Sequence, residues 1–441
     1  MFGESMNKNK PFKKYSVSQL NKNLFIAGSC LLLSGCFSPK SHSSFHEATS
    51  ENGEIALFLP LSGSRSPVAS QLRNAAMLAF EDENGKNIRN VKIFDTGLIS
   101  PQKAAEQAIA DKASIVLGPI TADETQEASS KLLASGIPEV SFTSDSRQSK
   151  EGLWVAGLTA RQQVSRLLEA LKAENKFKVA AFLPSNDFGK SFGEALLISC
   201  QENNFPTPQI VYHDESAEQI AQNLQFLAKT EDRQKAFEVA KAASSTATLE
   251  APPFQALLLV DTGINLRNII NYLPDSDIRP SEVQIMGPAL WRAFDAKLSA
   301  ISGAWYAAPS DENREAYVQK YEQKYHQKPL MITDIAYDLA TVTKELQNTH
   351  KLSAKKMVKA DAFKGIDGSF SFKENGRMER DLALYQILPS GGAKIMTQKD
   401  LIPATPVSPA VETVKTAVSE VQNSLAPSET PAKIETPQEA H

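Results

Sequence analysis

The sequence predicts an α/β fold built on parallel sheets, and three observations lead to this class. The apolar run at 114–117 is broken by Gly118-Pro119, followed by apolar residues at helical spacing and by a second apolar run at 138–142. Strand, turn, helix and strand in this order form the βαβ unit of an open parallel sheet. Similar alternations come before this unit and after it.

The first group of alternations covers about residues 54–158. Strands are expected at 54–60, 91–94, 114–117 and 138–142, with helices between them. Ser100 and Pro101 fit the N-cap and first position of the helix at 102–110. Polar loops should follow the first, third and fourth strands, at the sheet edge where ligands bind.

A second group of alternations begins near Trp154 and predicts a second α/β lobe, with a cleft between the two. Asn375-Gly376 is a strong turn signal for a late hairpin. Strands are expected at 179–183, 209–212, 255–260, 283–286 and 305–308, and helices at about 161–174, 191–200, 217–243, 313–325 and 332–347.

The N-terminal residues predict export and a lipid anchor. Five lysines precede the apolar run 24–33, which is too short to span a bilayer. The run leads into Leu33-Ser34-Gly35-Cys36, which resembles the bacterial lipoprotein signal; this implies that residues 1–35 are removed and Cys36 is acylated. The alternative is an ordinary signal peptide with a chance cysteine. Residues 36–53 are interpreted as a tether.

Charge and cysteine content limit the function further. Without residues 1–35 the chain keeps 42 basic and 50 acidic residues, so its net charge of −8 gives no reason to expect a nucleic-acid partner. Cys200 is then the only free thiol, and its apolar neighbours predict a buried, inert side chain. Residues 401–441, with scattered prolines, are predicted to be a disordered tail, although 411–421 could form a short helix.

Candidate ligand-binding residues lie in the loops that follow the predicted strands. Trp291 has two interpretations: packing inside a lobe, or stacking on a ligand or partner at the mouth of the cleft. The candidates are Ser62, Gly63, Pro119, Thr121, Thr143, Ser144 and Asp145 in the first lobe, and Asp187, Phe188, Asp261, Thr262, Pro288 and Trp291 in the later segments.

Catalytic, metal and cofactor chemistry have little support. Residues 189–193 match G-x-S-x-G, but residues 184–188 separate the expected strand from Ser191, so the serine does not stand at the strand–helix corner of a hydrolase. The same Gly-Lys-Ser has Pro184 where a P-loop needs its first glycine. The six histidines show no ligand cluster. No cofactor, no metal and no enzyme activity are expected.

Several segments together resemble the leucine-binding-protein family: 55–64, Leu117-Gly118-Pro119, 182–189, Ile285-Met286-Gly287-Pro288 and 365–387. The resemblance implies a type I periplasmic-binding fold, in which two doubly wound lobes close on a ligand about a hinge. The binding domain would cover 54–400, with lobe 1 at about 54–158 and 289–365 and lobe 2 at about 159–288 and 366–400.

Later segments resemble the penicillin-binding protein activators within that superfamily. The residues concerned are Pro252-Pro253-Phe254, Gly287-Pro288-Ala289-Leu290-Trp291, the 303–309 segment and Ala336-Tyr337-Asp338. The helical region 217–243 is also typical of that branch. This resemblance implies an outer-membrane lipoprotein that stimulates a bifunctional penicillin-binding protein, and Phe37 after Cys36 mildly favours the outer membrane.

The sequence departs from the pattern of the amino-acid binders. Those proteins hold the ligand ammonium with an acidic residue after the second-lobe Gly-Pro, where this chain has Ala289. Asp145, if it points inward, would repel a ligand carboxylate, and Phe188 replaces a frequent tyrosine. Asp187 or Asp261 could still supply a negative charge. The alternative function is therefore a solute receptor that delivers an amino acid, amide or small peptide to an ABC permease.

Overall fold

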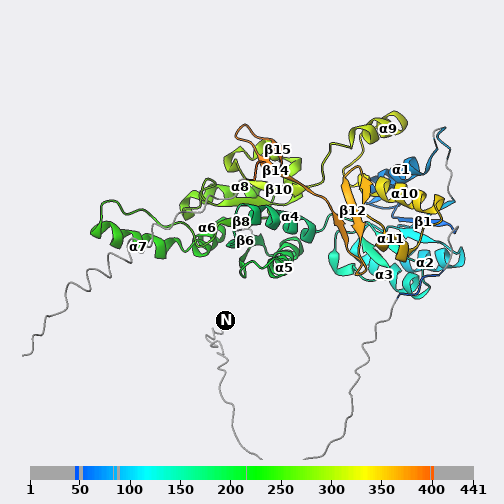
Figure 1. Cartoon of the computed structure of the whole chain (residues 1–441), viewed down its shortest axis with the longest axis horizontal. Helices are drawn as coiled ribbons and strands as arrows, with labels where there is room; N and C mark the ends of the chain where they lie inside the picture. Colours follow the sequence, from blue (N-terminus) through cyan, green and yellow to red (C-terminus); the bar gives the residue numbers. More distant parts are fainter. Residues whose placement is uncertain are drawn as a thin grey trace, which may run out of the picture. The chain divides into compact units, whose positions relative to one another are not determined.

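The structure is a computed structural model, and it describes residues 45–48, 53–82, 84–86, 90–214, 216–397 and 399–401. It confirms the α/β class, with parallel sheets flanked by helices (Figure 1). The predicted signal peptide, the lipidation site Cys36 and residues 402–441 of the predicted tail lie outside the described residues.

The first lobe contains a five-stranded parallel sheet in the order β2-β1-β3-β4-β5. β1, β3, β4 and β5 are buried along their whole length, whereas the edge strand β2 is only partly buried. Gly118, just after β3, has φ +94°, and a side chain there would collide with the carbonyl oxygen of Phe58. The strands are β1 (Ile55–Leu59), β2 (Val91–Asp95), β3 (Ile115–Leu117), β4 (Glu139–Ser141) and β5 (Leu153–Val155).

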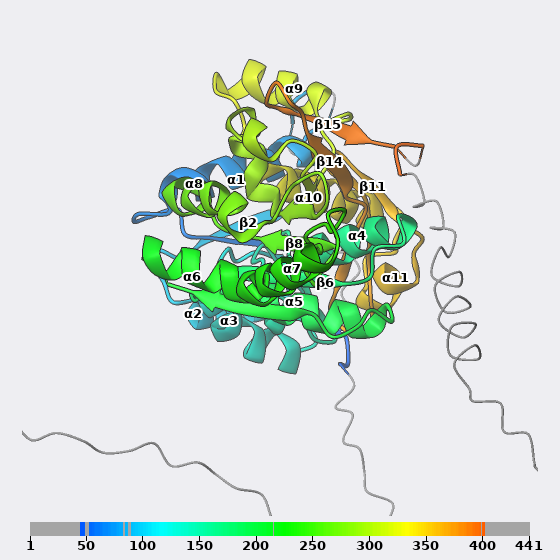
Figure 2. The ribbon, with the colours of Figure 1, turned by 90° about the vertical axis from the view of Figure 1, so that its left-hand side faces the viewer.

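Helices cover both faces of this sheet. α2 (Pro101–Ala110) and α3 (Ala122–Ala134) lie side by side on one face (Figure 1, Figure 2). The other face packs against α1 (Ser66–Phe80) and α10 (Thr333–Asn348). α2 begins as predicted, with Ser100 as its N-cap and Pro101 in its first turn. α9 (Glu315–Tyr325), α11 (Ala354–Lys359) and a small sheet of β11 (Phe363–Gly365), β12 (Gly368–Phe372) and β13 (Met378–Arg380) complete the lobe.

The second lobe contains a seven-stranded sheet in the order β15-β14-β10-β9-β8-β6-β7. Strands β10, β9, β8, β6 and β7 run parallel, and β14 and β15 are antiparallel additions at one edge. The strands are β6 (Val179–Pro184), β7 (Gln209–His213), β8 (Ala256–Leu259), β9 (Gln284–Gly287), β10 (Trp305–Ala308), β14 (Ala383–Ile387) and β15 (Ala393–Met396).

Two apolar clusters join this sheet to its helices. α4 (Ala160–Ala173) and α5 (Asp187–Glu202) pack on one face, where Cys200 is buried as predicted. Burial raises the pKa of the Cys200 thiol to about 11, which disfavours the reactive thiolate. α6 (Ala217–Leu227) and α8 (Gly263–Tyr272) pack on the other face, together with short 3-10 turns that include η3 (Ala289–Ala293).

The chain passes between the lobes three times, near residues 155–160, 308–315 and 380–383, and this differs from the predicted boundaries. Residues 289–308 belong to the second lobe, because Trp305 pairs with Met286 in the larger sheet. Residues 366–380 belong to the first lobe, where Phe370, Phe372 and Met378 are part of its core. Sheet pairing, rather than chain order, decides where the return segments lie.

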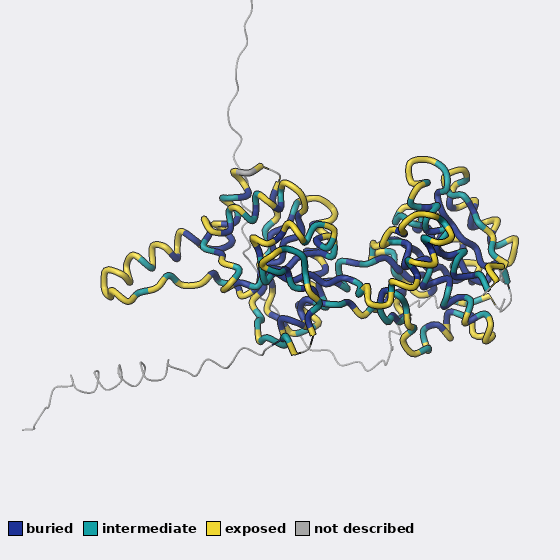
Figure 3. Tube along the Cα trace, turned by 90° about the horizontal axis from the view of Figure 1, so that it is seen from above, coloured by how far each residue is buried: buried dark blue, intermediate teal, exposed yellow. Residues whose placement is uncertain are grey.

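The helical region 217–243 is two helices rather than one. α6 ends at Leu227 and α7 (Thr230–Ala243) begins after Lys229, whose φ of +52° turns the chain. Thr230 and Arg233 are the buried residues of α7. Most of the helix and the chain that follows it are exposed (Figure 3). α7 is therefore a helix with little contact to its own sheet.

Residues 45–48 do not behave as the predicted tether. Phe45 packs against the first-lobe core, and the Ala48 amide donates to the Gly136 carbonyl at 2.8 Å. The Glu47 carboxylate accepts a hydrogen bond from the amide of Ala354, at the start of α11, at 2.7 Å. These four residues form a strap on the first lobe. Among the described helices, none has both the length and the apolar character needed to cross a bilayer.

Glu139 in β4 provides a test of the first lobe. Its side chain is fully buried, and neither carboxylate oxygen has a hydrogen-bond partner among the described residues. Burial holds the pKa of Glu139 well above its ordinary value, against the opposing effect of Lys150, so the folded protein favours the neutral acid.

The pKa of Glu139 is higher in the folded than in the unfolded protein. Below the unfolded pKa the side chain is neutral in both states, so the free energy of unfolding carries no penalty from its ionisation. We expect this free energy to fall, by about 1.4 kcal/mol per pH unit, as pH rises from the unfolded towards the folded pKa. Glu139→Gln should remove this decline in urea unfolding measured from pH 5 to 9. An unchanged pH slope in the variant would contradict the neutral-acid assignment.

Candidate functional site

In the first loop at the carboxyl edge of the first lobe, Ser62 is already bound to a carboxylate of the protein, that of Asp95 at the end of β2. Ser62, in the turn after β1, donates its amide to Asp95 Oδ1 at 3.1 Å and its hydroxyl to Asp95 Oδ2 at 2.6 Å. Burial opposes ionisation, but the hydrogen bonds from Ser62 and Gly97 lower the pKa of Asp95. Both donors of Ser62 are thus directed at a charged Asp95, while neighbouring Gly63 is exposed with φ +85°.

The other small residues of this edge shape the loops. The Pro119 carbonyl accepts from the Phe142 amide at 2.8 Å, which ties the turn after β3 to β4. Thr121 caps α3 by accepting from the Glu124 amide at 3.2 Å. These contacts place both residues at the carboxyl edge, as predicted.

The loop after β4 contains Thr143, Ser144 and Asp145. The Thr143 hydroxyl accepts from the Asp145 amide at 3.2 Å, and Thr143 is buried whereas Ser144 is exposed. The Asp145 carboxylate binds Arg147 through two 2.9 Å contacts. The hydrogen bond from Arg147 lowers the pKa of Asp145, so the carboxylate is charged but neutralised by its own loop.

Asp261, at the end of β8 in the second lobe, is not open to a ligand. Its side chain is buried and its Oδ2 lies 3.1 Å from His213 Nε2, at the end of β7. His213 Nδ1 lies 2.9 Å from the Asp214 carbonyl, and the imidazole stacks on Phe182. The two nitrogens of this histidine therefore have separate partners, and Asp261 belongs to an internal pair.

This pair predicts a second pH dependence. Burial lowers the pKa of His213, but Asp261 and the Asp214 carbonyl more than offset it, so the pKa is raised overall. The stabilisation from the charged imidazole is complete below the unfolded pKa, near 6.5, and is lost as pH rises through the folded pKa. We expect His213→Asn to flatten the stability profile between about pH 6 and 8. A His213→Asn profile parallel to the wild type would contradict a protonated pair.

The turn after β9 is filled by Trp291. Its indole is buried, donates to the Asp261 carbonyl at 3.1 Å and lies on Gly287, where a Cβ atom would come within 2.3 Å of the ring. The packing interpretation is therefore the correct one, and Trp291 offers no stacking face at an opening. Pro288 is buried, and the Ala289 amide donates to the buried Gln163 side chain at 2.7 Å.

Three predicted residues remain accessible at the second-lobe edge. Asp187 and Phe188 are exposed in the first turn of α5, where Asn186 is the N-cap. Thr262 is exposed before α8 and makes no capping hydrogen bond. A ligand of this lobe would meet Asp187 and Phe188 rather than Asp261.

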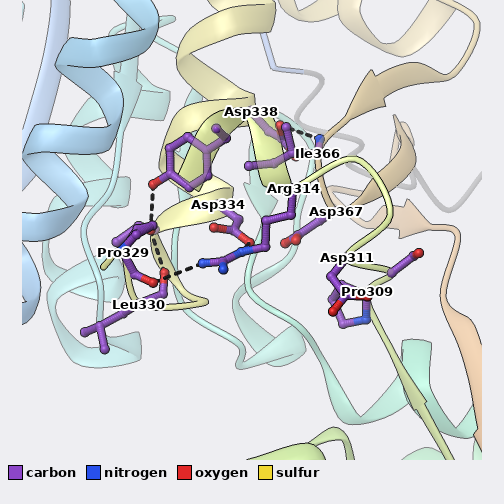
Figure 4. A network of polar contacts seen from close by, with 12 residues as sticks. Pro309, Asp311, Arg314, Pro329, Leu330, Asp334, Asp338, Ile366 and Asp367 are labelled. Carbon is purple, nitrogen blue, oxygen red and sulfur yellow. Dashed lines mark hydrogen bonds and ion pairs between the residues drawn. The ribbon is translucent and has the colours of Figure 1, made fainter. Parts of the chain in front are cut away.

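A buried ionic network lies in the first lobe, beside two of the passages between the lobes (Figure 4). Arg314, which precedes α9, donates to Asp334 at 2.5 Å and to the Pro329 carbonyl at 3.1 Å. Asp338, one turn further along α10, accepts from the Ile366 amide at 2.9 Å. Arg380 Nη1 lies 3.7 Å from Asp367 Oδ2 and 3.8 Å from Asp338 Oδ2.

Three carboxylates share this buried space with two guanidinium groups. Burial raises the pKa of Asp338 to about 6, although Ile366 and Arg380 favour its charged form. Burial also raises the pKa of Asp334 and Asp367, and Arg314 opposes the shift at both. Since Arg314 and Arg380 border the segments 308–315 and 380–383, the network fixes both segments to α10.

The functional residues that the sequence analysis did not predict are side chains that bind the residues of the candidate loops. Asp95, Arg147 and His213 each bind a predicted site residue, and Gln163 accepts from the amide of Ala289, next to the predicted Pro288. Position at a strand end is a signal that could have identified Asp95 and His213. Across the described ranges, no three His, Cys, Asp or Glu side chains come together in a way that could hold a metal ion.

Two parallel α/β lobes, three passages of the chain between them and loops at the carboxyl edges define a two-lobed binding protein. The chain belongs to the periplasmic binding protein family, whose model matches residues 54–393. No curated protein matches the chain.

Solved structures agree with this fold. Full-length LpoA from Haemophilus influenzae has a TM-score of 0.60 at 17% identity, covering 80% of this chain and 60% of that chain. The LpoA C-domain from the same organism, described as a regulator of PBP1A, has a TM-score of 0.57 at 17% identity over 78% of this chain and 100% of that one. A putative branched-chain amino acid ABC transporter from Rhodospirillum rubrum has a TM-score of 0.59 at 15% identity, with 78% and 99% covered.

This chain thus spans about 60% of full-length LpoA. The family match and these structures confirm the expected family and fold. They include one protein described as a regulator and one described as a putative amino acid ABC transporter.

Proposed function

We propose that this protein is a non-catalytic, lipid-anchored binding protein that docks on a bifunctional peptidoglycan synthase and stimulates it. One observation carries the proposal. The second-lobe edge has Ala289 after Pro288, while Asp261 is buried against His213. The ammonium group of an amino-acid ligand would find no carboxylate at position 289, and the Asp261 carboxylate is already bound to His213. A buried cation without a compensating charge is costly.

The first lobe supports the same conclusion. A ligand carboxylate near Ser62 would meet the charged Asp95, whose oxygens already accept both Ser62 donors. Like charges at close range repel more strongly at a partly desolvated site than in water. Similarity to the LpoA C-domain, a regulator of PBP1A, adds a precedent for the regulatory role on this fold.

The test uses the whole chain in detergent with a purified bifunctional synthase from the same organism. Glycan polymerisation and peptide cross-linking are followed as this protein is titrated. We expect a several-fold stimulation that saturates. Absence of binding together with an unchanged rate would overturn the proposal for that synthase.

The anchor is tested separately. Cys36 should carry acyl chains at the mature amino terminus, in the periplasm and most favourably at the outer membrane. Mass spectrometry of the amino-terminal peptide should show the added acyl mass, and Cys36→Ser should leave the signal segment in place. An unmodified Cys36 in the mature protein would overturn lipid anchoring.

A second function, solute delivery to an ABC permease, is favoured by the exposed Asp187 and Phe188 and by the similarity to the Rhodospirillum rubrum transporter structure. Ligand binding stabilises the folded state by mass action. A rise in Tm with millimolar amino acids, amides or short peptides, lost in Asp187→Asn, would support this function. No shift across the panel would oppose it.

A further inference from the structure

We propose that the synthase docks through an extended, basic peptide segment that adds a strand to the outer edge of β7, in the groove below the α6–α7 junction. This inference rests on the proposed function, since it names the surface and the partner segment. It uses the outer edge of β7, whose last residue His213 pairs with Asp261, together with the α6–α7 junction.

β7 presents an open edge. Among the described strands it is the last of the seven-stranded sheet and pairs with β6 alone. The His213 carbonyl accepts from the Ser185 amide on the β6 side. Because backbone groups alternate sides along a strand, Ile210 and Tyr212 direct their N–H and C=O groups to the outer edge. Such an edge is a template for another strand.

A groove runs beside this edge. A cavity of about 900 Å³ adjoins Gln209, Ile210 and Val211 on one side and the end of α6 and start of α7 on the other. Phe226, at the end of α6, borders it with 76% of its surface exposed. An exposed aromatic ring next to a free strand edge is the kind of anchor that extended peptides use.

The charges around the groove select the peptide. Glu231, Asp232 and Asp275 line it, with Lys229 as the one lysine or arginine among the lining residues. All four side chains are exposed. Glu231 is paired with Lys235 at 2.5 Å within α7, so Asp232 and Asp275 against Lys229 make the rim acidic. An acidic rim favours a basic segment, and rim charges of this type act on association rate and salt dependence.

Two matched pairs of variants test the groove with the whole chain in detergent and the same synthase. Phe226→Ala and Asp232→Lys should each weaken binding at least about fivefold. Val239→Ala and Glu238→Lys, on the exposed far part of α7, should leave the affinity within about twofold, because neither residue lines the cavity. Val239 is the matched control for Phe226, since the two side chains are 75% and 76% exposed. If Val239→Ala weakened binding as much as Phe226→Ala, or Glu238→Lys as much as Asp232→Lys, the groove would not be the docking site.

Hydrogen exchange distinguishes strand addition from helix contact. The Ile210 and Tyr212 amides should become protected when the synthase is added. Weaker binding by Phe226→Ala without this protection would overturn the added strand and leave a docking helix. A dimer of this protein lost in Phe226→Ala would make a second copy the occupant and overturn the synthase peptide.

Binding and stimulation of the synthase by the wild-type protein test the proposed function separately from the groove. Stimulation by the wild type with unchanged binding in Phe226→Ala and Asp232→Lys overturns the groove alone. Absence of binding by the wild type overturns both proposals for that synthase.

Discussion

Trp291→Ala is expected to lower the free energy of unfolding by about 3–5 kcal/mol, the usual cost of removing a large buried aromatic side chain. The indole is fully buried, donates to the Asp261 carbonyl and lies against Gly287. Its loss would leave a cavity beneath the turn after β9 and an acceptor without its donor. Urea unfolding followed by circular dichroism measures the change directly.

Leu290 is the matched control for this substitution. It is the preceding residue in η3, but 52% of it is exposed. Leu290→Ala should change the unfolding free energy by no more than about 0.5 kcal/mol. Similar losses in the two variants would mean that the turn itself, and not the buried ring, is sensitive to substitution.

Arg314→Met is the second change with a large expected effect, a loss of about 3–5 kcal/mol. Asp334 is fully buried, and removing the 2.5 Å contact leaves its carboxylate beside Asp367 without this guanidinium. The pKa of Asp334 is about 8 with Arg314 present, and removing Arg314 raises it further, so the loss should change little up to about pH 8 and widen above it. Unfolding curves of both proteins at pH 5, 7 and 9 test the sign.

The double variant Arg314→Met with Asp334→Asn should recover a large part of the loss, because the uncompensated charge is gone. Arg147→Met provides the surface comparison. Arg147 also binds an aspartate, Asp145, but its side chain is 73% exposed, so at most about 1 kcal/mol should be lost. Equal costs for Arg314 and Arg147 would refute the importance of burial.

The sequence was sufficient for the architecture but not for the division of the return segments. Alternating apolar runs and turn residues are local signals, and they located strands such as β3 and β9 and the cap of α2. Which sheet receives a strand is a non-local question. The run at Trp305–Ala308 looks the same in either lobe, and only its pairing with β9 and β14 places it in the second.

The candidate site shows the same limit at the level of side chains. Position after a strand correctly placed Ser62, Thr143 and Asp261 at carboxyl edges. Their roles depend on partners far along the chain: Ser62 binds Asp95, 33 residues away, and Asp261 binds His213, 48 residues away. Strand-end position marks Asp95 and His213 as edge residues, but no local pattern shows which residue each of them binds. Ser62 and Asp261 were therefore expected to face a ligand, whereas each is bound to another residue of the protein.

If Cys36 carries the proposed lipid anchor, the strap at residues 45–48 limits how far the first lobe can lie from the membrane. A fully extended chain spans about 3.5 Å per residue. With an anchor at Cys36, a free segment as far as Glu54 would allow a radius of about 60 Å, whereas attachment at Phe45 leaves about 30 Å. Release of Phe45 and Glu47 would about double this maximum reach. The four residues 45–48 therefore control the length of the free segment between the anchor and the first lobe.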